Sequence, residues 1–224
     1  MVRHACDISK IAYLEMLRTV RPGMTEWDVM ETLEHGYRSN GSRGPGYNTI
    51  VGAGLNGTVL HYTANKAPLQ KNDLIVIDSG ADFGGYTADV TRTIPAGGRF
   101  TARQREIYEL VLRALKASIK TVKAGCTFAQ VDKASRDIIN KAGYGDRFFH
   151  GIGHHLGLEV HDITPKGPLK AGAIITIEPG IYLPDENFGV RIEDDVVVTR
   201  DGCVNLTSGI PKSVAAIEKA MAAG

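Results

Sequence analysis

The segment Leu74-Ile-Val-Ile-Asp-Ser-Gly80 recurs in the second half of the chain as Ile174-Ile-Thr-Ile-Glu-Pro-Gly180. In each segment an apolar run that favours a buried strand ends in a carboxylate, Asp78 or Glu178. A carboxylate at the end of a buried strand is costly unless a cation, hydrogen bonds or a proton compensates it. The two segments therefore predict matching strands that each bring an acidic side chain to a functional site.

Further matches in the same order extend this repeat. Val20-Arg-Pro-Gly-Met-Thr25 resembles Val122-Lys-Ala-Gly-Cys-Thr127, where a helix ends at glycine and threonine caps the next one. His61 and His161 precede the first carboxylate of their halves by the same distance. We interpret the pattern as the duplication of an α/β unit, with halves at about 1–121 and 122–224.

Hydrophobic spacing and capping signals predict the elements of each half. Helices are expected at 4–20, 25–39, 102–123 and 127–141. Strands are expected at 47–52, 58–62, 73–79, 86–93, 174–178, 190–199 and 203–206. Glycines 84 and 85 predict a turn before the strand that carries Asp89.

Composition narrows the class of protein. The chain has 224 residues, 43% of them hydrophobic, and a net charge of +1. This balance predicts a folded chain with neither a nucleic-acid partner nor a membrane partner. Its three cysteines are too far apart in sequence for a disulfide framework or a metal-spaced cluster, which favours a reducing, cytoplasmic location.

Five residues stand out as candidate metal ligands. They are four carboxylates and one imidazole, namely Asp78, Asp89, His154, Glu178 and Glu193. Such a set can hold two divalent cations about 3.5–4 Å apart, as in two-metal hydrolases. Oxygen-rich ligation favours Mn²⁺, with Co²⁺ and Zn²⁺ open as alternatives. The neighbouring His155 is interpreted as a packing residue.

Several segments together resemble the pita-bread metallopeptidases, the family of creatinase, prolidase and methionine aminopeptidase. The segments are Gly46–Gly52, Leu60–Thr63, Gly85–Thr93, Gln104–Tyr108, His150–Asp162, Thr176–Gly180 and Arg191–Asp195. Within the family the chain is most similar to the catalytic domain of the Xaa-Pro aminopeptidases. The resemblance implies an α+β fold in which two pseudo-symmetric α/β halves surround a curved, mostly antiparallel sheet.

The resemblance also implies roles for individual residues. Asp89 and Glu193 match the ligands that bridge the two metals, Asp78 matches a ligand of one metal, and His154 and Glu178 match ligands of the other. Three histidines, His61, His150 and His161, match residues that line the substrate site, with His150 and His161 as stabilisers of the oxyanion. Glu178 would also move the proton of the attacking water. Arg191 and Tyr182 match residues that orient the ligands.

The implied activity is a dinuclear metal-dependent hydrolysis of the amino-terminal Xaa-Pro bond, with peptides that carry proline second as substrates. Three alternatives stay open: an Xaa-Pro dipeptidase (prolidase), a methionine aminopeptidase and a non-catalytic peptide-binding module on the same fold. We expect one catalytic domain over 1–224, without the amino-terminal domain that is usual among the proline-specific relatives. A homodimer is left open as the assembly.

Overall fold

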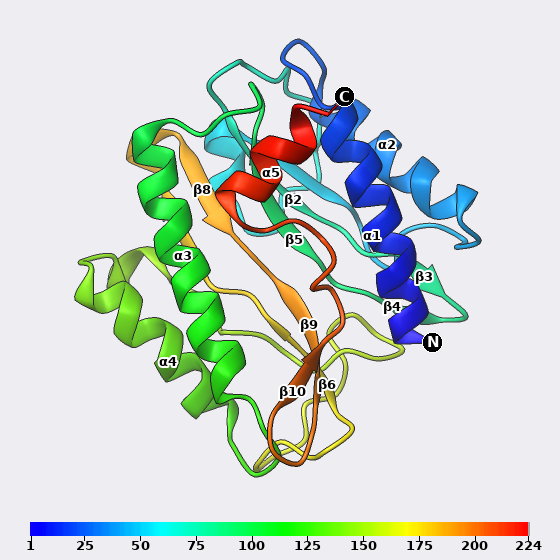
Figure 1. Ribbon diagram of the computed structural model, residues 1–224, viewed down its shortest axis with the longest axis vertical. Helices are drawn as coiled ribbons and strands as arrows, with labels where there is room; N and C mark the ends of the chain where they lie inside the picture. Colours follow the sequence, from blue (N-terminus) through cyan, green and yellow to red (C-terminus); the bar gives the residue numbers. More distant parts are fainter. Residues whose placement is uncertain (224) are drawn as a thin grey trace.

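Two helix pairs flank the strands of the computed structural model, which describes residues 1–223 (Figure 1). The first pair is α1 (Val2–Thr19) and α2 (Glu26–Ser39), and the second is α3 (Ala102–Thr121) and α4 (Phe128–Lys141). Each agrees with a predicted helix to within two residues at either end. Residue 224, the end of the expected domain, lies outside the described residues. Among residues 1–223, no helix is both long enough and apolar enough to cross a bilayer.

The helix starts follow the predicted capping chemistry. In α2 the Thr25 hydroxyl accepts a hydrogen bond from the Asp28 amide, and the Asp28 carboxylate accepts one from the Thr25 amide. The same reciprocal pair forms between Thr127 and Gln130 at the start of α4. Capping boxes satisfy amide donors that the first helical turn leaves without partners, so both second helices begin at equivalent points of the repeat.

The strands also recur in the two halves. The first half contains β1 (Ile50–Ala53), β2 (Leu74–Asp78), β3 (Asp82–Phe83), β4 (Tyr86–Thr87) and β5 (Thr91–Pro95). The second contains β6 (Ile174–Ile177), β7 (Gly180–Leu183), β8 (Phe188–Arg191), β9 (Asp194–Val198) and β10 (Cys203–Asn205). Two three-stranded sheets have the orders β1-β2-β5 and β10-β9-β6, and hairpins pair β3 with β4 and β7 with β8. Every strand pair within residues 1–223 is antiparallel.

The two halves meet where β5 runs beside the segment that joins β8 to β9. The Glu193 amide donates to the Thr91 carbonyl at 3.0 Å. The Thr93 hydroxyl donates to the Arg191 carbonyl and accepts from the Arg191 amide, at 2.8 and 3.0 Å. Hydrogen bonds therefore join the halves beside two of the predicted metal ligands.

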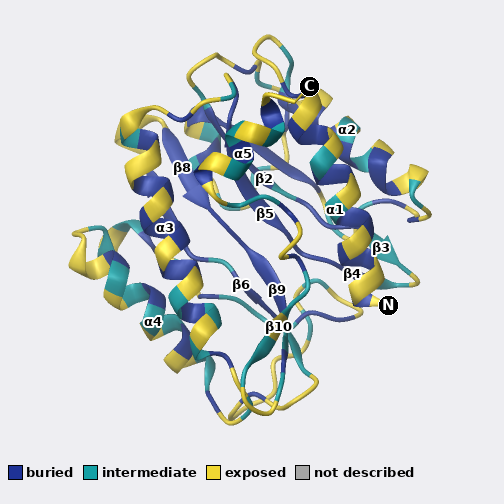
Figure 2. Ribbon diagram, in the orientation of Figure 1, coloured by how far each residue is buried: buried dark blue, intermediate teal, exposed yellow. Residues whose placement is uncertain are grey.

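Burial follows the predicted pattern of strands inside and amphipathic helices outside. Figure 2 shows β2, β5, β8 and β9 almost wholly buried, whereas β3 and β10 are partly exposed and the helices alternate between buried and exposed residues. The apolar run of β2, from Leu74 to Ile77, is at most 1% exposed. The helix α5 (Val214–Met221), which the sequence did not predict, adds Ile217 to this core.

The predicted strand at 58–62 is wrong. This stretch contains the end of a 3₁₀-helix, η1 (Gly54–Thr58), followed by a turn. Gly54 adopts a φ of +56° that favours glycine and turns the chain out of β1. Val59 and Leu60, whose types favoured a strand, remain partly or mostly exposed because tertiary context overrides β-propensity.

The predicted strands 86–93 and 190–199 are each interrupted. Asp89 lies between β4 and β5, and Glu193 lies between β8 and β9. A break in the strand pairing at each point allows the acidic side chain to leave the regular alternation of the sheet. The interruptions therefore coincide with the two residues that the repeat places in equivalent positions.

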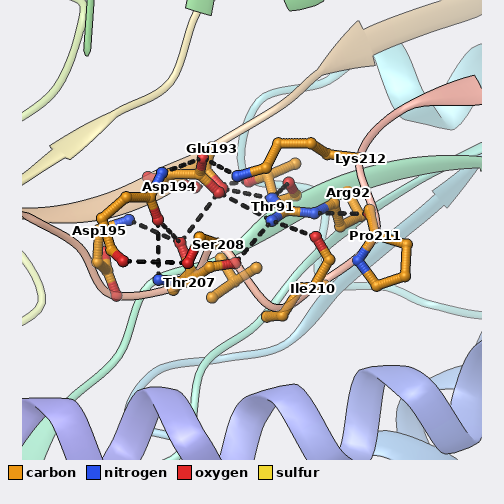
Figure 3. Close-up of polar contacts among 12 residues, drawn as sticks. Thr91, Arg92, Glu193, Asp194, Asp195, Thr207, Ser208, Ile210, Pro211 and Lys212 are labelled. Carbon is orange, nitrogen blue, oxygen red and sulfur yellow. Dashed lines mark hydrogen bonds and ion pairs between the residues drawn. The ribbon is translucent and has the colours of Figure 1, made fainter. Parts of the chain in front are cut away.

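A buried arginine supports the segment that follows Glu193. Arg92 is among the residues drawn in Figure 3, and its guanidinium donates to the Glu193 carbonyl at 2.5 Å and to the Asp194 carboxylate at 2.8 Å. Lys212 approaches the second oxygen of Asp194. Burial alone would raise the pKa of Asp194, but Arg92 and Lys212 hold it below its usual range. Asp194 is therefore ionised at neutral pH.

We expect Arg92→Met to lower the free energy of unfolding by about 3–5 kcal/mol, because it leaves a buried carboxylate without its main partner. Urea unfolding at pH 7 measures the loss. The matched control is Lys133→Met, which removes an exposed pair with Asp137 and should cost about 0.5 kcal/mol or less. Equal losses in the two variants would contradict this account.

The same network predicts a pH dependence of stability. The pKa of Asp194 is lowered in the folded state, so its contribution is present above the unfolded value of about 3.9. That contribution is lost as the pH falls from about 4 through the lower folded value. Urea unfolding of the unmodified chain and of Asp194→Asn between pH 7 and pH 3 should show a difference that shrinks only below about pH 4.

Candidate metal centre

Four chain segments bring the predicted carboxylates together. Asp78 is the last residue of β2, and Glu178 directly follows β6 at the equivalent point of the second half. Asp89 and Glu193 come from the two interruptions described above, and they are 4% and 2% exposed. Both halves thus contribute one carboxylate from a strand end and one from a strand break.

Three of the five predicted ligands form the tightest group. One ligand atom from each of Asp89, His154 and Glu193 lies within 4.8 Å of the others. The Nε2 atom of His154 is 3.4 Å from the Asp89 carboxylate and 3.6 Å from that of Glu178. This spacing allows one cation to contact side chains from both halves.

The orientation of His154 suits a ligand. Its Nδ1 lies 2.9 Å from the carbonyl oxygen of His155, which can only accept a hydrogen bond. The proton of a neutral ring therefore belongs on Nδ1, and the lone pair of Nε2 faces the carboxylates. The His155 ring points elsewhere and packs edge-on against Phe128, as the sequence interpretation expected.

Hydrogen bonds hold the carboxylates in place. The Tyr47 hydroxyl lies 2.7 Å from Asp78 and 2.5 Å from Asp89, within reach of both ligands. Arg191 donates to the other oxygen of Asp78 at 2.7 Å. The Thr91 hydroxyl donates to Glu193 at 2.6 Å. Such contacts set the direction of a ligand before any ion binds.

A chain of hydrogen bonds runs behind the site. Arg191 donates to the Tyr182 hydroxyl at 3.1 Å, and that hydroxyl lies 2.9 Å from Nε2 of His150. The Nδ1 atom of His150 lies 2.9 Å from the Gly151 carbonyl. Burial and the Arg191 charge lower the pKa of His150 to about 4, so this ring is neutral at physiological pH.

The acidic groups strongly perturb one another. Burial and the Asp78 charge raise the pKa of Asp89, and burial with the Asp89 charge raises that of Glu193 well above its usual range. Burial opposes protonation of His154, but the Asp89 carboxylate raises its pKa to about 9. Both effects reflect negative charge concentrated in a space of low polarity.

The donor set fits divalent metal ions. Carboxylate oxygens and one imidazole nitrogen are ligands that Mn²⁺, Co²⁺ and Zn²⁺ accept. A divalent cation beside Asp89 and Glu193 would offset the repulsion that raises their pKa values. Tyr47 and Thr91 contact the carboxylates by hydrogen bonds, as residues around metal ligands usually do.

The carboxylates lie in a cavity of about 630 Å³. Nine of the ten predicted site residues line it, namely His61, Asp78, Asp89, His150, His154, His161, Glu178, Arg191 and Glu193. Tyr182 is 1% exposed and lies behind His150. The His161 ring stands at 90° to that of His154, with centroids 4.3 Å apart, and 6.2 Å from that of His61.

Three supporting residues were not assigned a role from the sequence. Tyr47 lies in the quoted segment Gly46–Gly52, and Thr91 follows Asp89 by two residues. Asp195 follows Glu193 by two residues, and its carboxylate accepts the Asp89 amide at 3.0 Å across the junction of the halves. Spacing by two from a predicted ligand was the available signal for Thr91 and Asp195, and membership of a quoted segment was the signal for Tyr47.

Comparisons with known proteins agree with this fold and site. The chain matches the model of "Metallopeptidase family M24" over residues 1–200. It is 37% identical to the Xaa-Pro aminopeptidase of Escherichia coli, covering 100% of this chain and 58% of that protein. It is 39% identical to the Xaa-Pro dipeptidase of Pyrococcus furiosus, covering 92% of this chain and 60% of that protein. The chain thus spans about three fifths of the length of these relatives.

Solved structures of aminopeptidases share the fold of this chain. The aminopeptidase PepP of Pseudomonas aeruginosa superposes with a TM-score of 0.95 at 38% identity, covering 99% of this chain and 58% of that chain. Zinc-substituted E. coli aminopeptidase P in complex with product superposes with a TM-score of 0.94 at 36% identity, covering 99% and 57%. The predicted pita-bread α+β fold is therefore confirmed, and the chain belongs to metallopeptidase family M24.

Proposed function

We propose that this chain is the catalytic domain of a dinuclear metal-dependent aminopeptidase that hydrolyses the amino-terminal Xaa-Pro bond of peptides. The observation that carries the proposal is the group of Asp89, His154 and Glu193, with ligand atoms within 4.8 Å, in a cavity large enough for a short peptide. The names of the relatives above support the substrate class. We further propose that the domain extends over 1–224, with the two halves that the repeat predicts.

The five predicted ligands divide between the two ions in our proposal. Asp89 and Glu193 come from the two strand interruptions and would contact both ions. Asp78 would complete one site, and His154 and Glu178 the other. Divalent ions bound there supply electrophilic activation of the scissile carbonyl and of the attacking water. We propose Mn²⁺ as the ion, because four of the five ligands offer oxygen.

The remaining groups handle protons and developing charge. Glu178 would accept the proton of the attacking water and deliver it to the leaving nitrogen. Both ring nitrogens of His150 lie within hydrogen-bonding distance of protein groups, so we assign it to shaping the cavity wall rather than to the oxyanion role that the resemblance implied. Within residues 1–223, the rings of His61 and His161 make no hydrogen bond to protein. We therefore propose that His161 donates to the oxyanion and that His61 contacts the substrate.

The preference for proline would follow from the chemistry of the scissile bond. An Xaa-Pro amide nitrogen carries no hydrogen, so the site needs no acceptor opposite it. Apolar side chains and imidazoles form part of the cavity lining, including Ile50, Leu60 and Val160. A secondary amide would leave its N–H without a partner against such a wall, which lowers its affinity.

Partners and location complete the proposal. We propose peptides as the only macromolecular substrates, with no nucleic-acid or membrane partner, because the net charge is +1. Three free cysteines, Cys6, Cys126 and Cys203, support a reducing location such as the cytoplasm. A homodimer stays open as the assembly.

An Xaa-Pro dipeptidase is the second candidate, since the Pyrococcus furiosus relative that bears this name is 39% identical to the chain. With added Mn²⁺, we expect cleavage of an Arg-Pro-Pro peptide and of longer Xaa-Pro peptides, measured as release of the first residue. Cleavage restricted to dipeptides would favour the dipeptidase. Cleavage of Met-Ala-Ser but not of Arg-Pro-Pro would favour a methionine aminopeptidase, and no cleavage would favour a binding module.

We expect Asp89→Asn to reduce both bound Mn²⁺ and peptidase activity by at least tenfold, because the neutral amide removes charge at the proposed bridge. Bound metal is measured by equilibrium dialysis and activity by peptide hydrolysis. The matched control is Asp73→Asn, at a carboxylate that accepts the Gln70 amide outside the cavity. Unchanged metal content and activity in Asp89→Asn would contradict the proposed two-metal site.

We expect Tyr47→Phe to weaken metal binding by about 10- to 100-fold, because it removes the hydroxyl that contacts Asp78 and Asp89 together. Titration with Mn²⁺ followed by calorimetry measures the change. Tyr86→Phe is the control, because among residues 1–223 its hydroxyl makes no hydrogen bond to protein. Equal affinities for Tyr47→Phe and the unmodified chain would show that this hydroxyl does not orient the ligands.

A further inference from the structure

A short loop beside the cavity is closed at its base by a buried glutamate. Glu26 accepts hydrogen bonds from the Asn56 side chain and from the Tyr62 hydroxyl, both at 2.9 Å. Asn56 also donates to the Tyr62 hydroxyl at 2.9 Å. These three side chains form a closed ring of hydrogen bonds at the two ends of the loop 57–61.

The glutamate has a second pair of donors. The Ala53 amide donates to one carboxylate oxygen at 2.8 Å, and the Ala67 amide donates to the other at 2.9 Å. Each oxygen of Glu26 therefore receives one backbone and one side-chain hydrogen bond. Glu26 thus ties the chain before the loop, the two ends of the loop and the chain after it to one point.

The environment of Glu26 makes this arrangement strong. The residue is 0% exposed, and among residues 1–223 it has no ion pair. It is the first residue of α2, where the helix dipole favours negative charge. A buried carboxylate without a cation depends on its hydrogen bonds, and bonds to a charged acceptor are stronger than neutral ones.

The last two residues of the loop belong to the cavity lining. Leu60 and His61 both line it. Within residues 1–223, the His61 side chain makes no hydrogen bond to protein, so its position depends on the backbone of the loop. Closing the loop at Asn56 and Tyr62 restricts that backbone and reduces the conformational entropy lost when His61 meets a ligand.

The equivalent position in the other half has a related contact. Phe128 is the first residue of α4, and its ring packs edge-on against His155 at 5.4 Å. The His155 carbonyl accepts the Asp162 amide, next to His161. The first residue after the capping threonine thus contacts the histidine-bearing segment in both halves, through a carboxylate in one and an aromatic ring in the other.

We propose that Glu26 is a positioning residue that holds His61 and Leu60 against the peptide-binding cavity while itself contacting neither metal nor substrate. The proposal rests on the peptidase function proposed above for what His61 contacts. The closure of the loop itself is independent of that function and can be tested without substrate.

Hydrogen exchange followed by mass spectrometry tests the closure in both metal-free and Mn²⁺-loaded protein. We expect Glu26→Gln and Tyr62→Phe to speed exchange across residues 54–66 by about tenfold or more, because each removes a hydrogen bond that involves the carboxylate. Tyr62→Phe keeps the glutamate and its backbone donors, so it tests the ring of bonds even where a change at Glu26 prevents folding.

The matched control is Asp28→Ala, which removes the carboxylate half of the exposed capping box of the same helix and leaves the ring of bonds intact. We expect this variant to leave exchange across 54–66 and the hydrolysis of Xaa-Pro peptides unchanged. Equal exchange in Asp28→Ala and Tyr62→Phe would assign the effect to general loosening of α2, and unchanged exchange in Tyr62→Phe would show that the ring does not close the loop. Either result would overturn the proposal.

Kinetics then separate positioning from a merely structural role. We expect Glu26→Gln to lower kcat/KM for an Xaa-Pro tripeptide by about 10- to 100-fold with Mn²⁺ content unchanged, because a displaced contact group loses its orientation. In a His61→Ala background the same change should cost less than about twofold, because the two residues act as a unit. Additive losses would overturn the proposal. Inactivity of the unmodified chain toward Xaa-Pro peptides would instead refute the proposed function and leave the exchange test standing.

Discussion

The cost of placing several carboxylates together inside a folded chain is the constraint on which this structure depends. Asp89 and Glu193 are almost fully buried at the junction of the two halves, where burial and mutual repulsion raise their pKa values. Without compensation, such a site would protonate or open. The fold answers with hydrogen bonds from Tyr47 and Thr91 and with the charge of Arg191, and the donor set fits a divalent cation.

The same junction explains why the polar core extends beyond the ligands. Arg92 comes from the first half and donates to the Glu193 carbonyl and to the Asp194 carboxylate of the second half. Conversely, Asp195 of the second half accepts a hydrogen bond from the Asp89 amide of the first half. Each half therefore holds a predicted metal ligand of the other, so folding of the chain also positions these carboxylates. Further out, Glu26 accepts hydrogen bonds from both ends of a loop that lines the cavity.

Much of the architecture was predictable because local chemistry and global fold agree. Capping threonines marked the helix starts, and apolar runs ending in Asp78 and Glu178 marked the equivalent strands. The predictions that proved wrong lie where local propensity conflicts with tertiary contacts. Val59 and Leu60 favour a strand, yet the chain turns at Gly54 to bring the following loop to the cavity. Asp89 and Glu193 also interrupt two strands that were predicted as continuous from the apolar residues around them.

The sequence by itself determined the repeat, the elements that carry the ligands and the chemical types at the site, because these depend on residue spacing and intrinsic preference. Only the tertiary structure decided that Thr91 and Asp195 support the predicted ligands, because these contacts cross between residues about 100 positions apart, as between Thr91 and Glu193. It also decided that Glu26, an ordinary first-turn residue by sequence, is buried without an ion pair among the described residues. These contacts and the burial of Glu26 depend on how side chains pack in the interior, which residue spacing along the chain does not predict.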